Sequence, residues 1–268
     1  DSGDYEIADD YWSMFQYTVE DHPEFILTVP MSDKVDMGGG SVWINFTLHY
    51  NQLFGSYTSF WNGGCTTSSF LNLWDQENDT RFRDERIRPA TGINQGFLMD
   101  QQYSVSGHEL KTRGGDPLVF SPSVNLYDSP EHFGVRVVKF GPNPNTERQF
   151  SSTNNVPLLR ISDIYLARAE AKLRLNDQAG ALADINTLRR KRSANGKTLP
   201  ELTTLTLEDI LNERGFELYW EGHRRQDLIR FEKFTEAWQE KPVTTSNKAL
   251  FPLPTSALDV NQNLQQNP

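Results

Sequence analysis

The sequence has very little cysteine: Cys65 is the single one in 268 residues. One thiol cannot form an internal disulfide, and it cannot supply a zinc site that relies on several cysteines. Long hydrophobic runs are lacking too, because no stretch approaches the roughly 18 apolar residues of a membrane-spanning helix. The composition therefore excludes a disulfide scaffold and gives no sign of a transmembrane segment.

Basic residues are in the minority, with 26 Lys and Arg against 36 Asp and Glu and a formal net charge of −10. This surplus of acidic groups argues against a nucleic-acid partner, whose phosphates attract positive charge. The chain starts Asp1-Ser2-Gly3-Asp4, with neither a basic leader nor an apolar stretch, so we expect any signal peptide to be absent or already removed. Hydrophobic residues make up 37% of the chain, which is enough to form a core.

Charged and aromatic residues are divided unevenly near Pro157. Residues 1–157 hold 10 basic and 21 acidic side chains and 23 of the 31 aromatic residues, whereas residues 158–241 hold 15 basic and 14 acidic ones. The first part is also rich in Gly, Pro and Asn and shows little helical periodicity. We expect a loop-rich, aromatic ligand-binding region over 1–157 and a helical region over 158–268, which can be two layers of one fold.

Helical periodicity is clearest just after residue 157. Apolar residues recur every three or four positions over 158–176 and again over 178–192, which predicts two amphipathic helices. The short turn at Asn176-Asp177 makes them an antiparallel hairpin. Its spacing resembles one tetratricopeptide-type unit. The expected fold is therefore mainly α, with tetratricopeptide-like helical hairpins and a long loop-rich, partly β segment.

The other expected elements are shorter. A helix with Thr206 as its N-cap is predicted to run to residue 219 or 220, and another is predicted over 227–238. Alternating prolines make residues 250–254 an extended strap, which we expect to be pinned by its apolar side chains. Strand composition occurs at three places, namely 25–29, 42–46 and 133–140.

No motif commits the chain to catalysis. The sequence has no Gly-x-Ser-x-Gly elbow, no dinucleotide-binding glycine pattern and no phosphate loop, and its five histidines show no metal-ligand spacing. The acidic residues at 75–79 resemble the start of a calcium-binding loop, but Thr80 and Arg86 occupy positions where Gly and Glu are required. We therefore expect no cofactor.

Three carboxylates form one stripe of the helix predicted after Thr206, namely Glu213, Glu217 and Glu221. Such a stripe could hold a metal ion or an acid–base pair. Because arginines crowd the same segment, ion pairing is the favoured interpretation.

The segment from Thr47 to Trp74 combines aromatic rings with amide side chains in glycine-rich loops. The C–H face of a sugar packs on an aromatic ring, and Asn or Gln can bond to its hydroxyl groups. Burial of these rings in the core is the alternative. The predicted glycan-binding residues are Trp61, Asn62, Tyr57, Trp74, Asn51 and Tyr50.

Three motifs in the second half resemble the SusD/RagB family. They are Val156–Ala171, Ile210–Arg230 and the ending Leu250–Pro254 followed by 261–268, in the order that the family has them. Because family members are commonly near twice this length and carry a lipid-bearing cysteine at the mature N-terminus, the chain resembles the C-terminal half of such a protein.

The resemblance implies a nutrient-binding protein of the outer membrane. Family members are surface-exposed lipoproteins of Bacteroidetes that capture oligosaccharides and pass them to a SusC-like TonB-dependent transporter, and they are not enzymes. Membrane attachment would then be only through a lipid anchor that this chain does not carry. Two alternatives stay open, a glycoside hydrolase with two carboxylates across a cleft and a peptide-binding surface protein.

Overall fold

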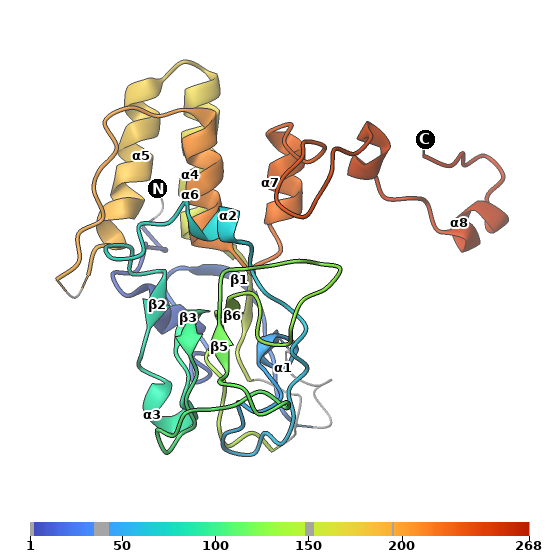
Figure 1. The fold of residues 1–268 in the computed structure, drawn as a ribbon. Coiled ribbons are helices and arrows are strands. Elements are labelled where there is room, and N and C mark those ends of the chain that lie inside the picture. Colours follow the sequence, from blue (N-terminus) through green and yellow to red (C-terminus); the bar gives the residue numbers. More distant parts are fainter. Residues whose placement is uncertain (1–2, 35–42, 148–152, 195, 268) are drawn as a thin grey trace.

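The computed structural model describes residues 3–34, 43–147, 153–194 and 196–267. The longer helices gather at one end of the molecule, and the other end holds short strands, loops and two short helices (Figure 1). In chain order the described elements are η1 Tyr11–Phe15, β1 Phe25–Val29, α1 Trp43–Thr47, α2 Ser68–Leu71, β2 Arg83–Asp84, α3 Arg88–Thr91, β3 Gln95–Leu98, β4 Asp100–Gln101, β5 Val119–Phe120, β6 Arg136–Val138, β7 Val156–Arg160, α4 Ile161–Arg174, α5 Gln178–Lys191, α6 Leu207–Leu218, α7 Arg224–Arg230, η3 Ser246–Ala249 and α8 Thr255–Val260.

The hairpin predicted from the periodicity is formed by α4 and α5, which lie side by side in Figure 1. Asn176 takes a left-handed conformation in the turn (φ 64°), and the Asp177 carboxylate caps α5 by accepting the Gly180 N–H at 2.9 Å. Leu166, Ile185 and their neighbours form a fully buried cluster between the two helices. The predicted hairpin is confirmed.

The start of α4 differs from the prediction. Residues 156–160 form β7, which pairs antiparallel with β1, and the helix begins only at Ile161. Proline at 157 lacks an N–H, and Arg160 is extended (φ −123°, ψ 154°). Pairing with the predicted strand at 25–29 therefore outweighs the helical periodicity of Leu158 and Leu159.

Of the next two helices, α6 begins where the sequence predicts, but α7 is shorter than predicted. Thr206 forms a capping box with Asp209 at the start of α6, as expected for its N-cap position. The helix predicted over 227–238 is wrong in its extent, because α7 ends at Arg230. Glu232 is left-handed (φ 62°), and the Lys233 and Phe234 N–H groups bond back to the Leu228 carbonyl, which terminates the helix.

The predicted strand at 42–46 is wrong, since its described residues lie in the short helix α1; Val42 lies outside the described residues. Backbone N–H groups of residues 61–63 donate to the carbonyls of Asn45, Phe46 and Leu48. The carbonyl groups at the end of this helix thus accept hydrogen bonds from a loop, and no strand partner is needed for them.

The strand at 133–140 shortens to β6, which pairs with β3. Gly134 is left-handed (φ 82°), and the Arg136 guanidinium bonds to the carbonyls of residues 133 and 134, so the ladder begins only afterwards. Residues 251–254 are free of helix as expected. Phe251 is not buried as the expected pinning would require: it is 69% exposed on a C-terminal segment that extends away from the body (Figure 1), and its ring contacts the Arg225 guanidinium at 4.0 Å.

The largest aromatic cluster of the core joins the two parts of the chain. Rings from η1, β3 and the 70–82 segment pack against Tyr219, which directly follows α6. Trp74 lies 5.7 Å from Tyr219 and 5.2 Å from Phe97, both edge to face. The loop-rich region is therefore packed on the helical region through ring contacts.

Candidate functional site

Two carboxylates of the predicted stripe, Glu213 and Glu217, lie on α6, whereas Glu221 follows the end of the helix at Leu218; all three pair with arginines inside the protein. Glu217 is fully buried and accepts hydrogen bonds from Arg81 (3.0 Å), Arg160 (2.9 Å) and Arg192 (2.7 Å). Burial acts to raise the pKa of Glu217, but Arg192 and Arg160 outweigh it and hold that pKa well below its usual range. The ion-pairing interpretation of the stripe is confirmed for Glu217.

The network continues into both parts of the chain. Glu24 pairs with Arg160 at 2.6 Å and with Arg192 at 2.9 Å. Glu221 pairs with Arg160 at 2.7 Å and with Lys139 at 2.5 Å. Burial lowers the pKa of Lys139 to about 8, although Glu221 acts in the opposite direction. Because these groups are buried and paired with one another, they form a scaffold and offer no surface to a ligand.

Two of the predicted glycan-binding rings lie in the core. Tyr57 is 2% exposed and packs against Phe54 and Phe60, and Trp74 is 6% exposed among Phe82, Phe97 and Phe216. For these two residues the alternative of core packing holds, because each ring belongs to a cluster of buried hydrophobic side chains. Neither ring presents a face to a sugar in this structure.

Trp61, by contrast, is 44% exposed. The nearby ring of Phe46, which the sequence placed in a strand, is 42% exposed and lies on Gly63 and Gly64. A Cβ at either glycine would approach that ring to about 3 Å, so the Gly-Gly pair is what makes room for it. Two aromatic rings thus lie open to solvent at this loop.

Two of the remaining predicted residues are linked to Glu131, Asn62 directly and Tyr50 through Arg113, while Asn51 bonds to the nearby residue Lys111. The Asn62 side chain donates to the Glu131 carbonyl at 2.8 Å and accepts from the Arg136 guanidinium at 2.6 Å. Arg113 binds the Glu131 carboxylate through its Nε at 2.7 Å and lies 4.1 Å above the centre of the Tyr50 ring. Asn51 donates to the Lys111 carbonyl at 2.7 Å.

Ion pairs fix the charges of this cluster. Burial acts to raise the pKa of Glu131, but hydrogen bonds from Arg113 outweigh it and keep that pKa below its usual range. His49 Nε2 lies 3.3 Å from the same carboxylate, and burial of the ring lowers the His49 pKa. We call this surface the Trp61 face, and it comprises Phe46, Tyr50, Asn51, Trp61, Asn62, Arg113 and Glu131. Sequence reasoning missed Phe46, Arg113 and Glu131, whose roles depend on contacts between distant loops.

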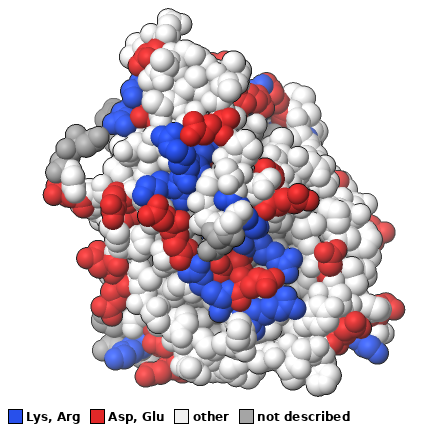
Figure 2. All heavy atoms as spheres, turned by 90° about the vertical axis from the view of Figure 1, so that its left-hand side faces the viewer, with Lys and Arg blue, Asp and Glu red and all other residues white. Residues whose placement is uncertain are grey.

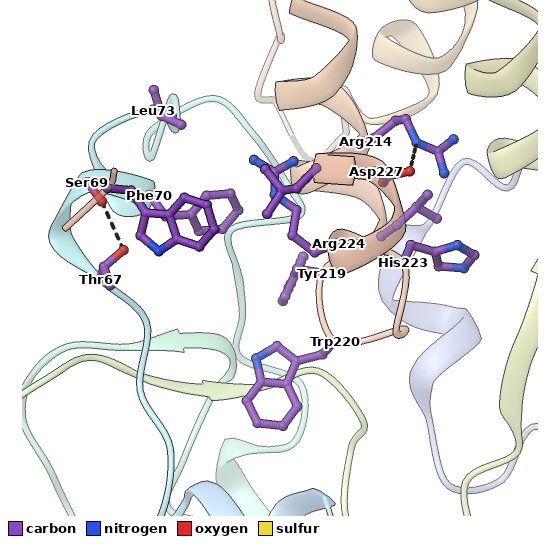
Figure 3. Close-up of a pocket in the computed structure, with 14 residues that line it drawn as sticks. Thr67, Ser69, Phe70, Leu73, Arg214, Tyr219, Trp220, His223, Arg224 and Asp227 are labelled. Carbon is purple, nitrogen blue, oxygen red and sulfur yellow. Dashed lines mark hydrogen bonds and ion pairs between the residues drawn. The ribbon is translucent and has the colours of Figure 1, made fainter. Parts of the chain in front are cut away.

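A second concave site lies between α2, α6 and α7 (Figure 3). It has a volume of about 550 Å³, and mainly apolar side chains line it, among them Phe70, Leu73 and Trp238. The charged groups at its edge already have partners: Arg214 binds Asp227 at 2.8 Å, and Arg224 donates to the Leu211 carbonyl at 2.7 Å. The lining of this groove is therefore mainly apolar, with its charged groups confined to ion pairs and backbone hydrogen bonds at the edge.

Charged side chains of both signs lie next to each other on the face shown in Figure 2. The exposed ion pairs of the described chain include Lys191–Asp9 (2.7 Å) and Arg86–Asp10 (2.7 Å). In the part of the chain that the structure describes, no group of three or more His, Cys, Asp or Glu side chains could hold a metal ion. No described helix is long and apolar enough to cross a membrane.

Comparison with known proteins identifies the family. The family model described as "SusD family" matches residues 23–268. The chain belongs to the SusD family. It is 35% identical over 219 residues to the starch-binding protein SusD of Bacteroides thetaiotaomicron, an alignment that covers 76% of this chain and 35% of that protein.

Solved structures show the same fold. A SusD superfamily protein from Parabacteroides distasonis superposes with a TM-score of 0.67 at 20% identity. The alignment covers 99% of this chain and 54% of the Parabacteroides chain. Surface glycan-binding protein A of Bacteroides thetaiotaomicron, solved with laminarihexaose, gives a TM-score of 0.64 at 20% identity, with 99% of this chain and 56% of that one covered. This SusD-family chain therefore spans about half the length of these solved relatives.

Proposed function

We propose that this SusD-family chain binds a glycan on the Trp61 face and does not cleave it. The observation that carries the proposal is the solvent-exposed ring of Trp61 beside Asn62. Next to them, Glu131 binds Asn62 through its carbonyl and Arg113 through its carboxylate, and Arg113 lies over the Tyr50 ring. Rings supply the apolar surface and the paired polar groups supply the donors and acceptors that a sugar needs. Relatives named for binding starch or solved with laminarihexaose support a carbohydrate ligand.

The two regions then have different tasks. Residues 1–157 would carry the ligand-binding face, and residues 158–268 would form the helical scaffold, with α4 and α5 as a tetratricopeptide-like unit. Tyr57 and Trp74 belong to the support of the site in this proposal. The ligand-contacting residues are reduced to Trp61, Asn62, Asn51 and Tyr50, joined by Phe46.

The family also suggests where the protein works. We infer that it acts at the surface of the outer membrane and delivers captured oligosaccharides to a SusC-like TonB-dependent transporter. Family membership is the support for both inferences. Co-purification of a SusC-like protein with this chain, from membranes of the source organism, is the measurement that checks the partnership.

The glycan site is tested by calorimetry with soluble starch, laminarin and other polysaccharides from the source habitat. Trp61→Ala is expected to weaken binding of the cognate polysaccharide by about tenfold or more, which corresponds to roughly 1.4 kcal/mol. The matched control is Trp238→Ala, because Trp238 is 39% exposed and lines the groove of Figure 3. Loss of binding in the control with full binding in Trp61→Ala would place the site in the groove instead.

The alternatives have their own readouts. Release of reducing sugar from a bound polysaccharide would indicate a glycoside hydrolase. A screen without any glycan hit, followed by peptide binding in native mass spectrometry, would indicate a peptide-binding protein.

A further inference from the structure

Residues 100–120 form an extended structure next to the Trp61 face. β4 pairs with β5 at the base of this structure. Beyond that pair, the segment 108–112 forms one β-bridge to the chain after β4, Tyr103–Glu109, and one to the chain before β5, Lys111–Pro117. Backbone hydrogen bonds join Leu110 to Gln102 and Leu118 at 2.9 Å each. The segment 108–112 therefore lies across the end of the β4–β5 ladder, and we call it the crossbar.

Exposure alternates from residue 109 to residue 113. Glu109, Lys111 and Arg113 are exposed, Thr112 is buried and Leu110 is half-buried, while His108 at the start of the crossbar is exposed as well. This alternation is the period of an extended chain, so the exposed residues share one outward side. At about 3.3 Å per residue, Glu109 and Arg113 are at most roughly 13 Å apart along the chain. Tyr103 lies opposite Glu109 at one end, and Tyr50 lies under Arg113 at the other.

The two ends repeat the same combination of side chains. At one end Arg113 lies 4.1 Å above the Tyr50 ring and pairs with Glu131 at 2.7 Å. At the other end Arg88 lies 5.6 Å from the centre of the Tyr103 ring and 3.9 Å from the Glu85 carboxylate. Each end thus combines an aromatic ring with a guanidinium and a carboxylate, which suits the C–H face and the hydroxyl groups of a sugar.

The Tyr103 end is a formed hollow. It encloses about 460 Å³ between the end of α3 and the turn at 103–107, within the usual size of a small-molecule site. Gly92 is left-handed (φ 76°), and a Cβ there would meet the Ser104 carbonyl carbon at 2.7 Å. Only glycine allows α3 to approach the turn so closely, and this approach shapes the hollow.

Charged side chains of both signs occur on the crossbar and at its two ends. The carboxylates are Glu85, Glu109, Asp116 and Glu131, and the cations are Arg83, Arg88, Lys111 and Arg113. A polymer of one charge sign would meet as much repulsion as attraction there, so the surface suits an uncharged chain.

We propose that Tyr103, Arg88 and Glu85 form a second glycan-contact site, so that one uncharged polysaccharide chain lies along the crossbar and touches both ends. The inference rests on the proposed glycan-binding function of the Trp61 face. Two contacts on one polymer act together, so affinity should rise with ligand length once the chain reaches Tyr103.

The test compares ligand lengths by calorimetry on the full chain. The probes are laminarin or soluble starch, whichever the unmodified protein binds, and the oligosaccharides of that polymer in order of increasing length. Tyr103→Ala should weaken binding of the polymer by about tenfold and leave binding of the shortest bound oligosaccharide unchanged. Trp61→Ala should weaken both. The matched control is Tyr127→Ala, since Tyr127 is a freely exposed tyrosine away from the hollow.

Each outcome decides between the two proposals. If Tyr103→Ala and Arg88→Ala, each with an unchanged melting temperature, bind the polymer as tightly as the unmodified protein, the second site is wrong and the Trp61 site stands. Equal losses for short and long ligands would also overturn the length dependence. If the unmodified protein binds neither polymer nor any other glycan, the proposed function fails, and the second site fails with it.

Discussion

The Glu217 cluster and the Arg113–Glu131 pair contain the same two side-chain types in different surroundings. Glu217 and its arginines are fully buried, and they join α5, α6 and β7 to the N-terminal region. Arg113 is 63% exposed and holds Glu131 beside the Tyr50 ring. Buried ion pairs are strongly destabilising to break, whereas exposed pairs add little stability and stay available to a ligand. Burial, and not residue type, separates the scaffold from the candidate site.

The largest expected effect is that of Glu217→Ala, which leaves three buried guanidinium groups without their shared carboxylate. We expect the free energy of unfolding to fall by about 3–5 kcal/mol, measured by urea denaturation. Glu131→Ala is the matched substitution in the other cluster, and it should shift the urea midpoint far less. Similar losses for both variants would contradict the division between scaffold and site.

Tryptophan substitutions give the same comparison for aromatic rings. Trp74→Ala removes a ring buried against Phe97, Phe216 and Tyr219 and should lower stability by about 3–5 kcal/mol. Trp61→Ala should leave the thermal midpoint nearly unchanged, because that ring is open to solvent. A Trp61→Ala variant as unstable as Trp74→Ala would show that Trp61 belongs to the core.

Acid should act mainly through the buried cluster. The folded-state pKa of Glu217 is lowered, so the unfolded state takes up a proton first as the pH falls below about 4.5. Stability from this group is therefore fully present above that pH and is lost below it, by about 1.4 kcal/mol per pH unit. Urea denaturation at a series of pH values gives the free energy of unfolding as a function of pH. Below about pH 4.5 this free energy should fall less steeply with pH in Glu217→Gln than in the unmodified protein, while Glu131→Gln should keep a dependence near that of the unmodified protein.

The smallest expected effect on stability is that of Arg113→Ala. The guanidinium is exposed, so the urea midpoint should not change measurably. Glycan affinity should still fall by a few-fold, because the Trp61 face loses the Arg113 guanidinium as a hydrogen-bond donor and Glu131 loses its partner. Arg190→Ala removes the exposed Arg190–Glu201 pair away from the Trp61 face and is the control, with both properties expected to stay unchanged.

Local patterns predicted local structure well. The periodicity of residues 161–191 and the turn at Asn176 suffice for α4 and α5, since both depend on neighbours a few positions apart. The Thr206 cap is equally local. The strand β7 was missed because its partner, β1, lies more than 120 residues earlier, and the helix α1 was missed because its carbonyls are satisfied by residues 61–63.

The candidate site was also only partly foreseeable, for the same reason. Sequence composition marked the segment 47–74 as rich in rings, but it could not separate Tyr57 and Trp74, which are buried, from Trp61, which is exposed. That separation depends on which loops cover each ring. Arg113 and Glu131 could not be found at all from the segment, because the fold brings them to Tyr50 from more than 60 positions away.

The sequence by itself determined the family, the helical hairpin and the concentration of aromatic and acidic residues before Pro157. These follow from short motifs and from counts, which need no knowledge of distant contacts. Tertiary structure decided which carboxylates are buried, which rings are open to solvent and which guanidinium groups lie over Tyr50 and Tyr103. Burial and long-range contacts are set by packing of the whole chain, and they distinguish a binding surface from a core of similar composition.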